Sequence, residues 1–461
     1  MKRFLLLFAV LCCTMMASAN GPLPTDEIWY TSTNGQVVNP YKSNVFGATI
    51  ISNTYQNGKG VIKFDGTVTS IGTDAFWMCS SLNGITIPNS VTNIGPYAFA
   101  DCPNLTDIAI PNAVESIENF AFNNSGITSI TIPSSVTYIR NTAFEACPNL
   151  TSINIEQGNL VYDSRNNCNA IINTETNTLI SGCKNSVIPT SVTSIGESAF
   201  RGCALTSITI PNSVTTIGES AFTSCTALTS IEIPNSVTTI GGATFTDCTA
   251  LISIEIPNSV ATIEISMFYG CTALTSLVIP SSVTTIGILA FAECTALESI
   301  TFMQNTPPSP NDPSLDSFWF LNCSNLSSIY VPNAAVNTYK GEWSLYANII
   351  KAIDIDEHRA AAIAEIQNAF DGETGSAYLN GLVADEMTAL NNAATIEIIT
   401  ANKAAALAKL STVVPAYKAG KAEILGEMGT ECHDCPAVDV TKCTTTIRLY
   451  NPEKVEFMKT E

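Results

Sequence analysis

Apolar and polar residues alternate in a short phrase that returns along most of the chain at a constant spacing. One clear copy, residues 228–241, reads LTSIEIPNSVTTIG and has apolar side chains at every second position before its proline. This alternation predicts a β-strand that ends at the proline, because proline has no amide hydrogen to donate to a sheet. The step recurs 23 residues apart at Pro234, Pro257 and Pro280. Such a period predicts stacked coils that bury a core only against their neighbours.

Each coil closes on a phenylalanine, and a cysteine follows three positions later. The phenylalanines are Phe76, Phe99, Phe122, Phe144, Phe200, Phe222, Phe245, Phe268 and Phe291. The cysteines are Cys79, Cys102, Cys147, Cys203, Cys225, Cys248, Cys271, Cys294 and Cys323. Parallel strands lie about 4.8 Å apart, so we expect two columns of buried side chains. A free cysteine packs as a small hydrophobe, and Ser125 stands in the cysteine position of one coil, which favours packing over obligatory disulfides.

The repeats and the changes of composition around them set the expected domain boundaries. An end cap must precede the first coil, which would otherwise expose an apolar edge. Within this cap, Asn34-Gly35 and Asn57-Gly58 each predict a β-hairpin, the first between residues 28–31 and 37–38. The expected segments are a signal peptide at 1–19, an N-terminal cap at 20–60, a β-rich solenoid at 61–353, a helical module at 354–430 and a tail with a hairpin at 431–461.

The insertion at residues 156–186 contains a symmetric stretch, CNAIINTETNTLISGC. Folded as a β-hairpin, it brings three pairs into opposition: Ile172 with Leu179, Ile171 with Ile180, and Cys168 with Cys183. Directly opposed residues of a hairpin lie about 4.5–5.5 Å apart, within the range of a disulfide. We therefore predict a bridge between Cys168 and Cys183.

Two features are expected near the C-terminal end of the solenoid. Residues 305–317 hold too many prolines for a strand interior and predict an exposed loop. Tyr339, Trp343 and Tyr346 are expected to cover the last coil.

After residue 354 the chain becomes rich in Ala, Glu, Lys and Leu, with apolar residues at helical spacing. The spaced positions are Ile363, Ile366 and Phe370, then Leu379, Leu382, Val383 and Leu390, then Ile396, Ile399, Leu407 and Leu410. Three helices with one apolar face each predict a small bundle.

The N-terminus and the charge bear on the compartment and the partners. Lys2 and Arg3 precede a short apolar run and the small residues Ala17-Ser18-Ala19, which is the pattern of a secretory signal peptide cleaved after Ala19. No later stretch has the roughly 20 apolar residues of a membrane span. Acidic residues outnumber basic ones, 40 to 20, which argues against nucleic acid or an anionic membrane as a partner.

The sequence offers little catalytic chemistry. It has two histidines and lacks the nucleophile-elbow, zinc-protease and P-loop motifs, so we expect neither an enzyme nor a cofactor. In the tail, Cys432, His433, Cys435 and Cys443 are of the residue types that bind zinc, but a second C-x-x-C is missing. A local disulfide or free thiols are the alternatives there, and we predict no metal site.

The consensus of the coils, L-x-x-I-x-I-P-x-S-V-x-x-I-G-x-x-A-F-x-x-C, resembles the BspA-type leucine-rich repeats of bacterial surface proteins. The resemblance covers most of residues 61–353. It implies a curved solenoid whose concave side is lined by a parallel sheet. It also implies a role in adhesion, since some members of the family hold host matrix proteins or other cells.

One column of strand residues points away from the predicted core and is our candidate binding surface. It is polar and rich in threonine early in the repeats, and then changes character. Its candidate contact residues are Thr209, Glu232, Glu255, Val278, Thr301 and Tyr330. A column of serines runs beside them, and tyrosine is the best anchor available because it combines a large ring with a polar tip.

Together these features predict an exported or cell-surface protein that recognises a partner without catalysis. The expected partner is a host extracellular protein, a glycan or another cell surface. The alternative is a structural spacer or self-assembling scaffold whose helical module or tail carries the interaction. Deleting residues 352–461 separates the two, because capture of the partner survives only if the solenoid holds the site.

Overall fold

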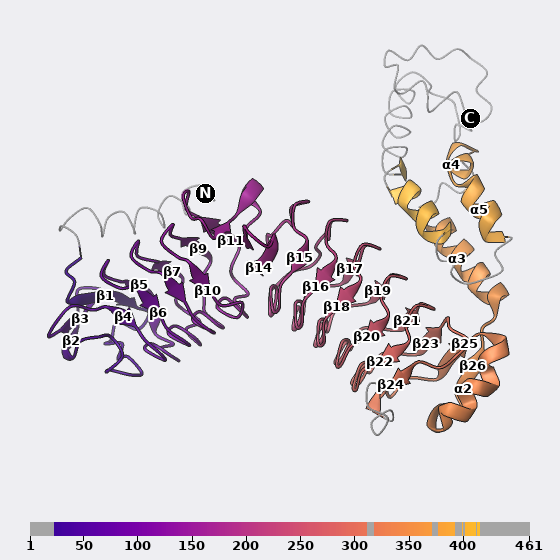
Figure 1. Ribbon diagram of the computed structural model, residues 1–461, viewed down its shortest axis with the longest axis horizontal. Coiled ribbons are helices and arrows are strands. Elements are labelled where there is room, and N and C mark those ends of the chain that lie inside the picture. Colours follow the sequence, from indigo (N-terminus) through magenta and orange to yellow (C-terminus); the bar gives the residue numbers. More distant parts are fainter. Residues whose placement is uncertain are drawn as a thin grey trace, which may run out of the picture. The chain divides into compact units, whose positions relative to one another are not determined.

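The computed structural model describes residues 23–310, 318–370, 377–391, 399, 402–411 and 413–414, without the side chains of residues 357, 358, 377 and 378. It divides into two compact units, Met1–Lys351 and Ala352–Glu461, which we treat separately (Figure 1). The predicted signal peptide and the tail with Cys432, His433, Cys435 and Cys443 lie outside the described residues.

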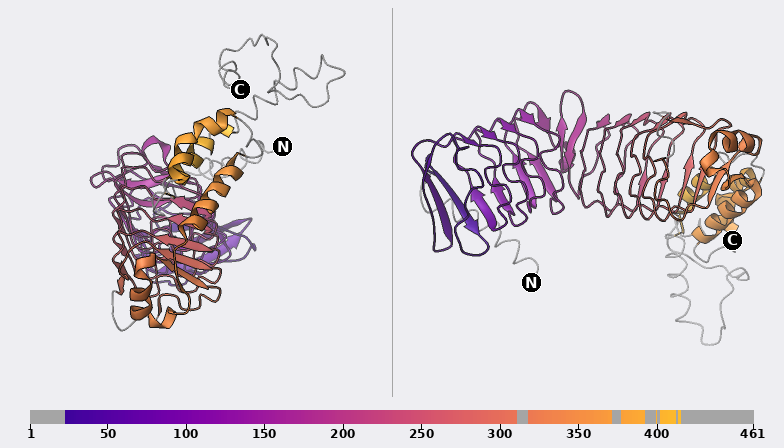
Figure 2. Two further views of the ribbon diagram at one scale, coloured as in Figure 1. Left: turned by 90° about the vertical axis from the view of Figure 1, so that its right-hand side faces the viewer. Right: turned by 90° about the horizontal axis from the view of Figure 1, so that it is seen from below.

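The first unit is a β-solenoid, as predicted, and its parallel strands pair in register between successive coils within several sheets (Figures 1 and 2). In the clearest pair of coils, Ser230 lies opposite Ser253, Ile231 opposite Ile254 and Glu232 opposite Glu255. Both strands run in parallel, so identical side chains stack in columns and the isoleucines all enter the core.

Two sets of strands run along the solenoid. The long strands are β5 (Leu82–Thr86), β7 (Asp107–Ala109), β9 (Ser129–Ile132), β11 (Ser152–Ile155), β17 (Ser230–Glu232), β19 (Ser253–Glu255), β21 (Ser276–Ile279), β23 (Ser299–Phe302) and β25 (Ser328–Val331), with β26 (Ile350–Ala352) at the end. The short strands are β4 (Ser70–Ile71), β6 (Asn93–Ile94), β8 (Ser116–Ile117), β10 (Tyr138–Ile139), β15 (Ser194–Ile195), β16 (Thr216–Ile217), β18 (Thr239–Ile240), β20 (Thr262–Ile263), β22 (Thr285–Ile286) and β24 (Ser309–Pro310). We call the outer surface of the long strands the long-strand face.

The phenylalanine column forms a continuous stack on each side of the insertion. Neighbouring rings lie nearly parallel, with centroids 5.3–5.9 Å apart from Phe76 to Phe144 and again from Phe200 to Phe320. The rings are buried from Phe76 through Phe291, which confirms the predicted spine. At the insertion, Gly182 leaves room for the Phe200 ring, which a Cβ atom would overlap.

The turn segment around each spine phenylalanine holds non-glycine residues in the left-handed region of φ. In one coil these are Ala243, with φ +53°, and Asp247, with φ +56°. The backbone amide of Ala243 donates to the carbonyl of Ile265 (2.8 Å), and that of Asp247 donates to the carbonyl of Tyr269 (2.7 Å). The hydrogen bonds to the next coil thus stabilise a backbone conformation that is unfavourable for residues other than glycine.

The N-terminal cap contains one of its two predicted hairpins and lacks the other. β2 (Ile50–Gln56) and β3 (Lys59–Phe64) form the hairpin expected across Asn57-Gly58. The hairpin across Asn34-Gly35 is wrong, because β1 (Glu27–Ser32) pairs antiparallel with β3 on one edge and with β5 on the other. With both edges taken, Val38 packs in the core instead, and its amide donates to the Tyr30 hydroxyl (3.2 Å).

The insertion contains β12 (Tyr162–Asp163), a 3₁₀ turn (Arg165–Asn167), β13 (Ala170–Asn173) and β14 (Thr178–Gly182). β13 and β14 form the predicted hairpin, with Ile172 opposite Leu179. The pairing then shifts by one residue, so Ile171 lies opposite Ser181 and not opposite Ile180 as predicted.

This register shift bears on the predicted Cys168–Cys183 disulfide, which the structure does not contain. Both thiols are free and buried. Cys168 packs in the core cluster of the later coils, whereas Cys183 packs in that of the earlier coils. The Cys183 thiol lies 3.3 Å from the carbonyl oxygen of Asn169.

At the C-terminal end of the solenoid, the proline-rich segment differs from its prediction and the aromatic cover of the last coil agrees with it. Part of the proline-rich segment predicted as an exposed loop forms β24, where the Ser309 amide donates to the Thr284 carbonyl (2.9 Å); residues 311–317 lie outside the described ones. Tyr339, on α2 (Val336–Glu342), and Trp343 cover the last coil, with the Trp343 ring 5.0 Å from that of Phe302. Two 3₁₀ turns, Asn333–Ala335 and Ser344–Tyr346, flank this helix.

The second unit has helices over much of the predicted module. They are α3 (Ile355–Ala369), α4 (Ala377–Leu382) and α5 (Ala384–Asn391), and residues 402–411 are also helical. The apolar side chains meet in a separate core that includes Ile366, Phe370, Leu390 and Leu410. The second predicted helix is divided at Val383, and Ile396 lies outside the described residues.

The positive φ of the turn segments predicts that two alanine-to-glycine substitutions change the free energy of unfolding in opposite directions. Ala243→Gly should raise the free energy of unfolding by about 1 kcal/mol, because glycine adopts positive φ without steric cost. Ala261→Gly, at a residue outside the left-handed region, should lower it by about 0.5–1 kcal/mol. Urea denaturation measures both changes, and a shift in the same direction for the two variants would contradict the account.

Candidate functional site

The long-strand face brings the candidate contact residues into one column. Thr209 bridges to Glu232, and Glu232 lies directly opposite Glu255. Further along, Val278 lies opposite Thr301. Thr209, Glu232, Glu255 and Val278 are exposed, so this part of the column is open to a partner.

The last two members of the column differ from the prediction that all of them face outward. Thr301 is only 5% exposed, so it cannot contribute a contact surface. It lies between the larger side chains of Val278 and Tyr330 in the ladder. Tyr330 is half-buried, which leaves only part of the ring that was expected to act as an anchor.

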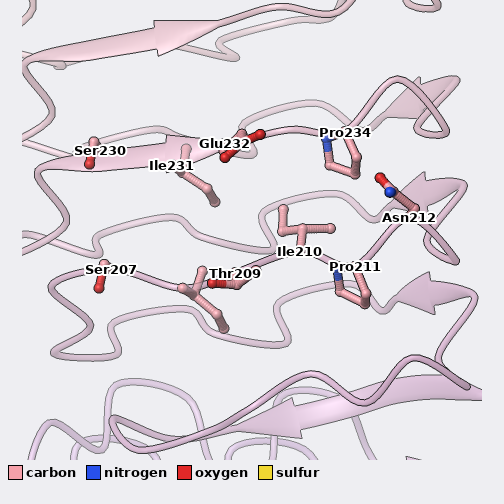
Figure 3. Close-up of a pocket in the computed structure, with 10 residues that line it drawn as sticks. Ser207, Thr209, Ile210, Pro211, Asn212, Ser230, Ile231, Glu232 and Pro234 are labelled. Atoms are coloured by element: carbon pink, nitrogen blue, oxygen red, sulfur yellow. The ribbon is translucent and has the colours of Figure 1, made fainter. Parts of the chain in front are cut away.

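A hollow of about 440 Å³ lies on the long-strand face between two successive coils (Figure 3). Ser230 at the start of β17 and Glu232 at its end line the hollow, together with Ser207 and Thr209 of the preceding coil. Its other lining residues are Ile208, Ile210, Pro211, Asn212, Ile231 and Pro234. Hydroxyl, amide and carboxylate groups thus meet over a floor of isoleucine and proline.

The charge on this part of the face is negative. None of the ion pairs among the described residues involves Glu232 or Glu255. Like charges placed directly opposite each other in a ladder destabilise a sheet by roughly 0.2–1 kcal/mol. The pair therefore costs stability in the isolated protein, and a partner with positive or hydrogen-bond-donating groups would remove that cost.

The polar groups of the hollow are those of serine, threonine, asparagine and glutamate, which donate and accept hydrogen bonds. Within the described part of the chain, no three metal-ligating side chains form a group that could hold an ion.

Two repeat positions have roles that the sequence analysis missed. In five coils the serine before the inner valine donates its hydroxyl to the valine carbonyl of the preceding coil at 2.5–2.7 Å. These serines are Ser90, Ser135, Ser236, Ser259 and Ser282. The signal was the constant serine of the S-V step, which marks a bond between coils and not a contact for a partner.

The cysteine column also carries bonds between coils. The thiols of Cys102, Cys147, Cys225, Cys248, Cys271, Cys294 and Cys323 lie 3.0–3.2 Å from the carbonyl oxygen of the phenylalanine one coil earlier. Ser125 takes the same place in its coil, 3.5 Å from the sulfur of Cys147. The column is free of disulfides, as predicted.

Burial keeps these thiols protonated. Loss of solvation raises the pKa of Cys248 and of Cys294 to about 12, and that of Cys147 to about 11. In the unfolded chain the same thiols ionise near about 8.5. The folded state therefore binds more protons above that pH, and stability falls as the pH rises through it.

Comparison with known proteins places the repeats in one family. The family described as BspA type leucine rich repeat region, in 6 copies, matches residues 49–173, 171–298 and 251–373. None of the curated proteins matches significantly. Among the described residues, no helix is long and apolar enough to cross a membrane.

Several solved structures are similar to the chain. A leucine-rich cell surface protein from Faecalibacterium prausnitzii A2-165 is 29% identical, with a TM-score of 0.45 over 60% of this chain and 65% of that one. A leucine-rich repeat protein from Eubacterium ventriosum ATCC 27560 is 27% identical, with a TM-score of 0.46 over 59% of this chain and 80% of that one. The pneumococcal vaccine antigen PcpA is 22% identical, with a TM-score of 0.45 over 62% and 71% of the two chains.

The protonated column predicts inert thiols in the folded protein. At pH 8, iodoacetamide should leave Cys248, Cys271 and Cys294 unlabelled, because the thiolate is the reactive form and the side chains are buried. Peptide mapping by mass spectrometry detects the label, and the same sites should be labelled fully in urea. Labelling of the folded chain at the rate of the urea sample would contradict the buried column.

Proposed function

The chain belongs to the BspA-type leucine-rich repeat family, and from this premise we propose that it is an exported or cell-surface protein that recognises a partner without catalysis. The partner is a host extracellular protein, a glycan or another cell surface. The role is that of an adhesin, and the long-strand face around Glu232 and Glu255 is its contact surface.

The observation that carries this proposal is the opposed glutamate pair beside the hollow. Most outward positions of the long strands hold threonine or serine, whose hydroxyls keep a sheet surface hydrated without charge. Glu232 and Glu255 stand in two successive coils at a position that holds threonine elsewhere, and repulsion between their carboxylates lowers the stability of the sheet. A residue choice that costs stability at an exposed site is expected where the side chain serves binding.

The chemistry of the hollow supports a partner with donor groups. Carboxylate oxygens accept hydrogen bonds from lysine, arginine, amides and sugar hydroxyls, and the neighbouring hydroxyls of Ser230 and Thr209 both donate and accept. Contacts of this kind are individually weak when exposed, so binding depends on several coils acting together.

Removal of the glutamate pair should affect stability and binding in opposite directions. Glu232→Thr with Glu255→Thr restores the residue found at Thr131 and Thr209. The double variant should be more stable by about 0.2–1 kcal/mol, because the repulsion is gone. Its capture by immobilised matrix proteins, mucin and bacterial glycans should fall at least tenfold against the native chain.

A matched control removes the same charge elsewhere. Glu197→Gln with Glu219→Gln acts on exposed residues of the turn segments and should leave capture unchanged. Surface plasmon resonance with the full chain measures all three proteins. If both double variants lost capture equally, the effect would come from net charge alone. If Glu232→Thr with Glu255→Thr left capture unchanged, the binding site would not lie on the long-strand face.

A further inference from the structure

The turn segments of the first coils, which are the stretches around each spine phenylalanine, hold aromatic residues where most later coils hold small ones. The position two residues before the spine phenylalanine holds Ser198, Ser220, Ala243, Ser266 and Leu289 in later coils. In two early coils the same position holds the aromatic residues Tyr97 and Phe120. The position after the spine phenylalanine holds Trp77 in the first coil, threonine at 223 and 246, and Tyr269 in one later coil.

These aromatic side chains lie on adjacent coils. The Phe76 amide donates to the Ala98 carbonyl (2.8 Å), and the Phe99 amide donates to the Ala121 carbonyl (2.8 Å), so the three turn segments form one ladder. The Tyr97 and Phe120 rings stack with centroids 4.9 Å apart. The Tyr41 ring meets the Trp77 ring edge-on at 4.8 Å.

Much of this aromatic surface is open to solvent. Tyr41 is 56% exposed, Met78 59% and Tyr97 40%. We call Tyr41, Trp77, Met78, Tyr97 and Phe120 the aromatic patch.

The backbone at these positions does not call for aromatic residues. Tyr97 has φ +55° and Phe120 has φ +57°, in the left-handed region where bulky side chains are disfavoured. Four later coils meet the same geometry with serine or alanine, so a smaller side chain satisfies the fold there, and Leu289 takes the position in the coil of Phe291. Strained and exposed aromatic residues that the fold does not need are expected where a ligand uses them.

Polar groups hold the rim of the patch in place. The Asp101 carboxylate accepts from the Trp77 indole N–H (2.9 Å) and from the Asn124 amide (2.8 Å). Lys42 pairs with Asp74 at 2.7 Å. Carboxylate and amide groups of this kind can bond to hydroxyl groups of a ligand.

From this juxtaposition we propose that the aromatic patch is a second binding site, separate from the long-strand face, and that it takes a neutral saccharide chain. Pyranose rings have apolar faces that stack on aromatic rings and hydroxyl edges that bond to carboxylates and amides. Nucleobases stack in the same way, but their phosphates are repelled by Asp74, Asp101 and the net charge of −20. The same repulsion disfavours sulfated and sialylated glycans.

A protein partner fits the patch less well than a sugar does. A stable protein interface buries about 800 Å² on each side and involves about 20–30 residues. The patch has five apolar side chains with a polar rim.

Calorimetry of the full chain with xylohexaose, cellohexaose and N-acetylchitohexaose tests the proposal. At least one of these neutral β-linked oligosaccharides should bind, and Tyr97→Ser with Phe120→Ser should weaken that binding at least tenfold. The thermal midpoint of this double variant should not fall by more than a few degrees, because serine is the residue of this position in later coils.

Two controls make the result specific. Tyr269→Thr changes a tyrosine of a later turn segment to the residue found at 246, and should leave oligosaccharide binding unchanged. Glu232→Thr with Glu255→Thr should also leave it unchanged, which separates this site from the long-strand face. The proposal is overturned if none of the three oligosaccharides binds the native chain, or if the serine variant binds as tightly as the native chain.

Discussion

In-register stacking of the coils is the constraint on which the rest of the solenoid depends. A single coil has two strands too short to stand alone, and its inner side chains find a core only in the coils before and after it. Register decides which residues meet, because a slip of one position would turn each strand's isoleucines outward. The phenylalanine rings, the cysteine thiols and the serine hydroxyls each meet their counterparts or a carbonyl one coil away, so these columns reinforce the same register.

The columns also explain which features could be predicted from the sequence. Positions that repeat in phase have the same environment in each coil, so Phe222 and Cys248 could be placed in the core from the period alone. Departures from the period were harder. The pairing of Ile171 with Ser181 depends on a local shift in the insertion, and Thr301 is buried although its ladder neighbour Val278 is exposed, which the period does not report. The pairing of β1 depends on which strand edges remain open, which the Asn34-Gly35 turn signal does not report.

Function follows from exceptions to the repeat. Stacking requires the inner residues and leaves the outer ones free, so an outer residue that departs from its column carries information that an inner one does not. On the long-strand face the opposed glutamates place charge at a position where other coils hold neutral residues. On the turn segments Tyr97 and Phe120 place aromatic rings at a position where most later coils hold serine or alanine. Only the glutamates were recognised from the sequence. Tyr97 and Phe120 occupy one repeat position, so the period places them together, but their exposure and the approach of Tyr41 to Trp77 depend on how the side chains pack.

A double-mutant cycle along the spine tests the stacking most directly. Replacing Phe245 and Phe268 by leucine, singly and together, should reveal a coupling of about 0.5–1.5 kcal/mol, because these rings stack with centroids 5.7 Å apart. The same cycle on Phe222 and Phe291, which are separated by two intervening rings, should give a coupling near zero. Absence of coupling between the neighbours, or equal coupling in both pairs, would contradict a solenoid held together by contacts between successive coils.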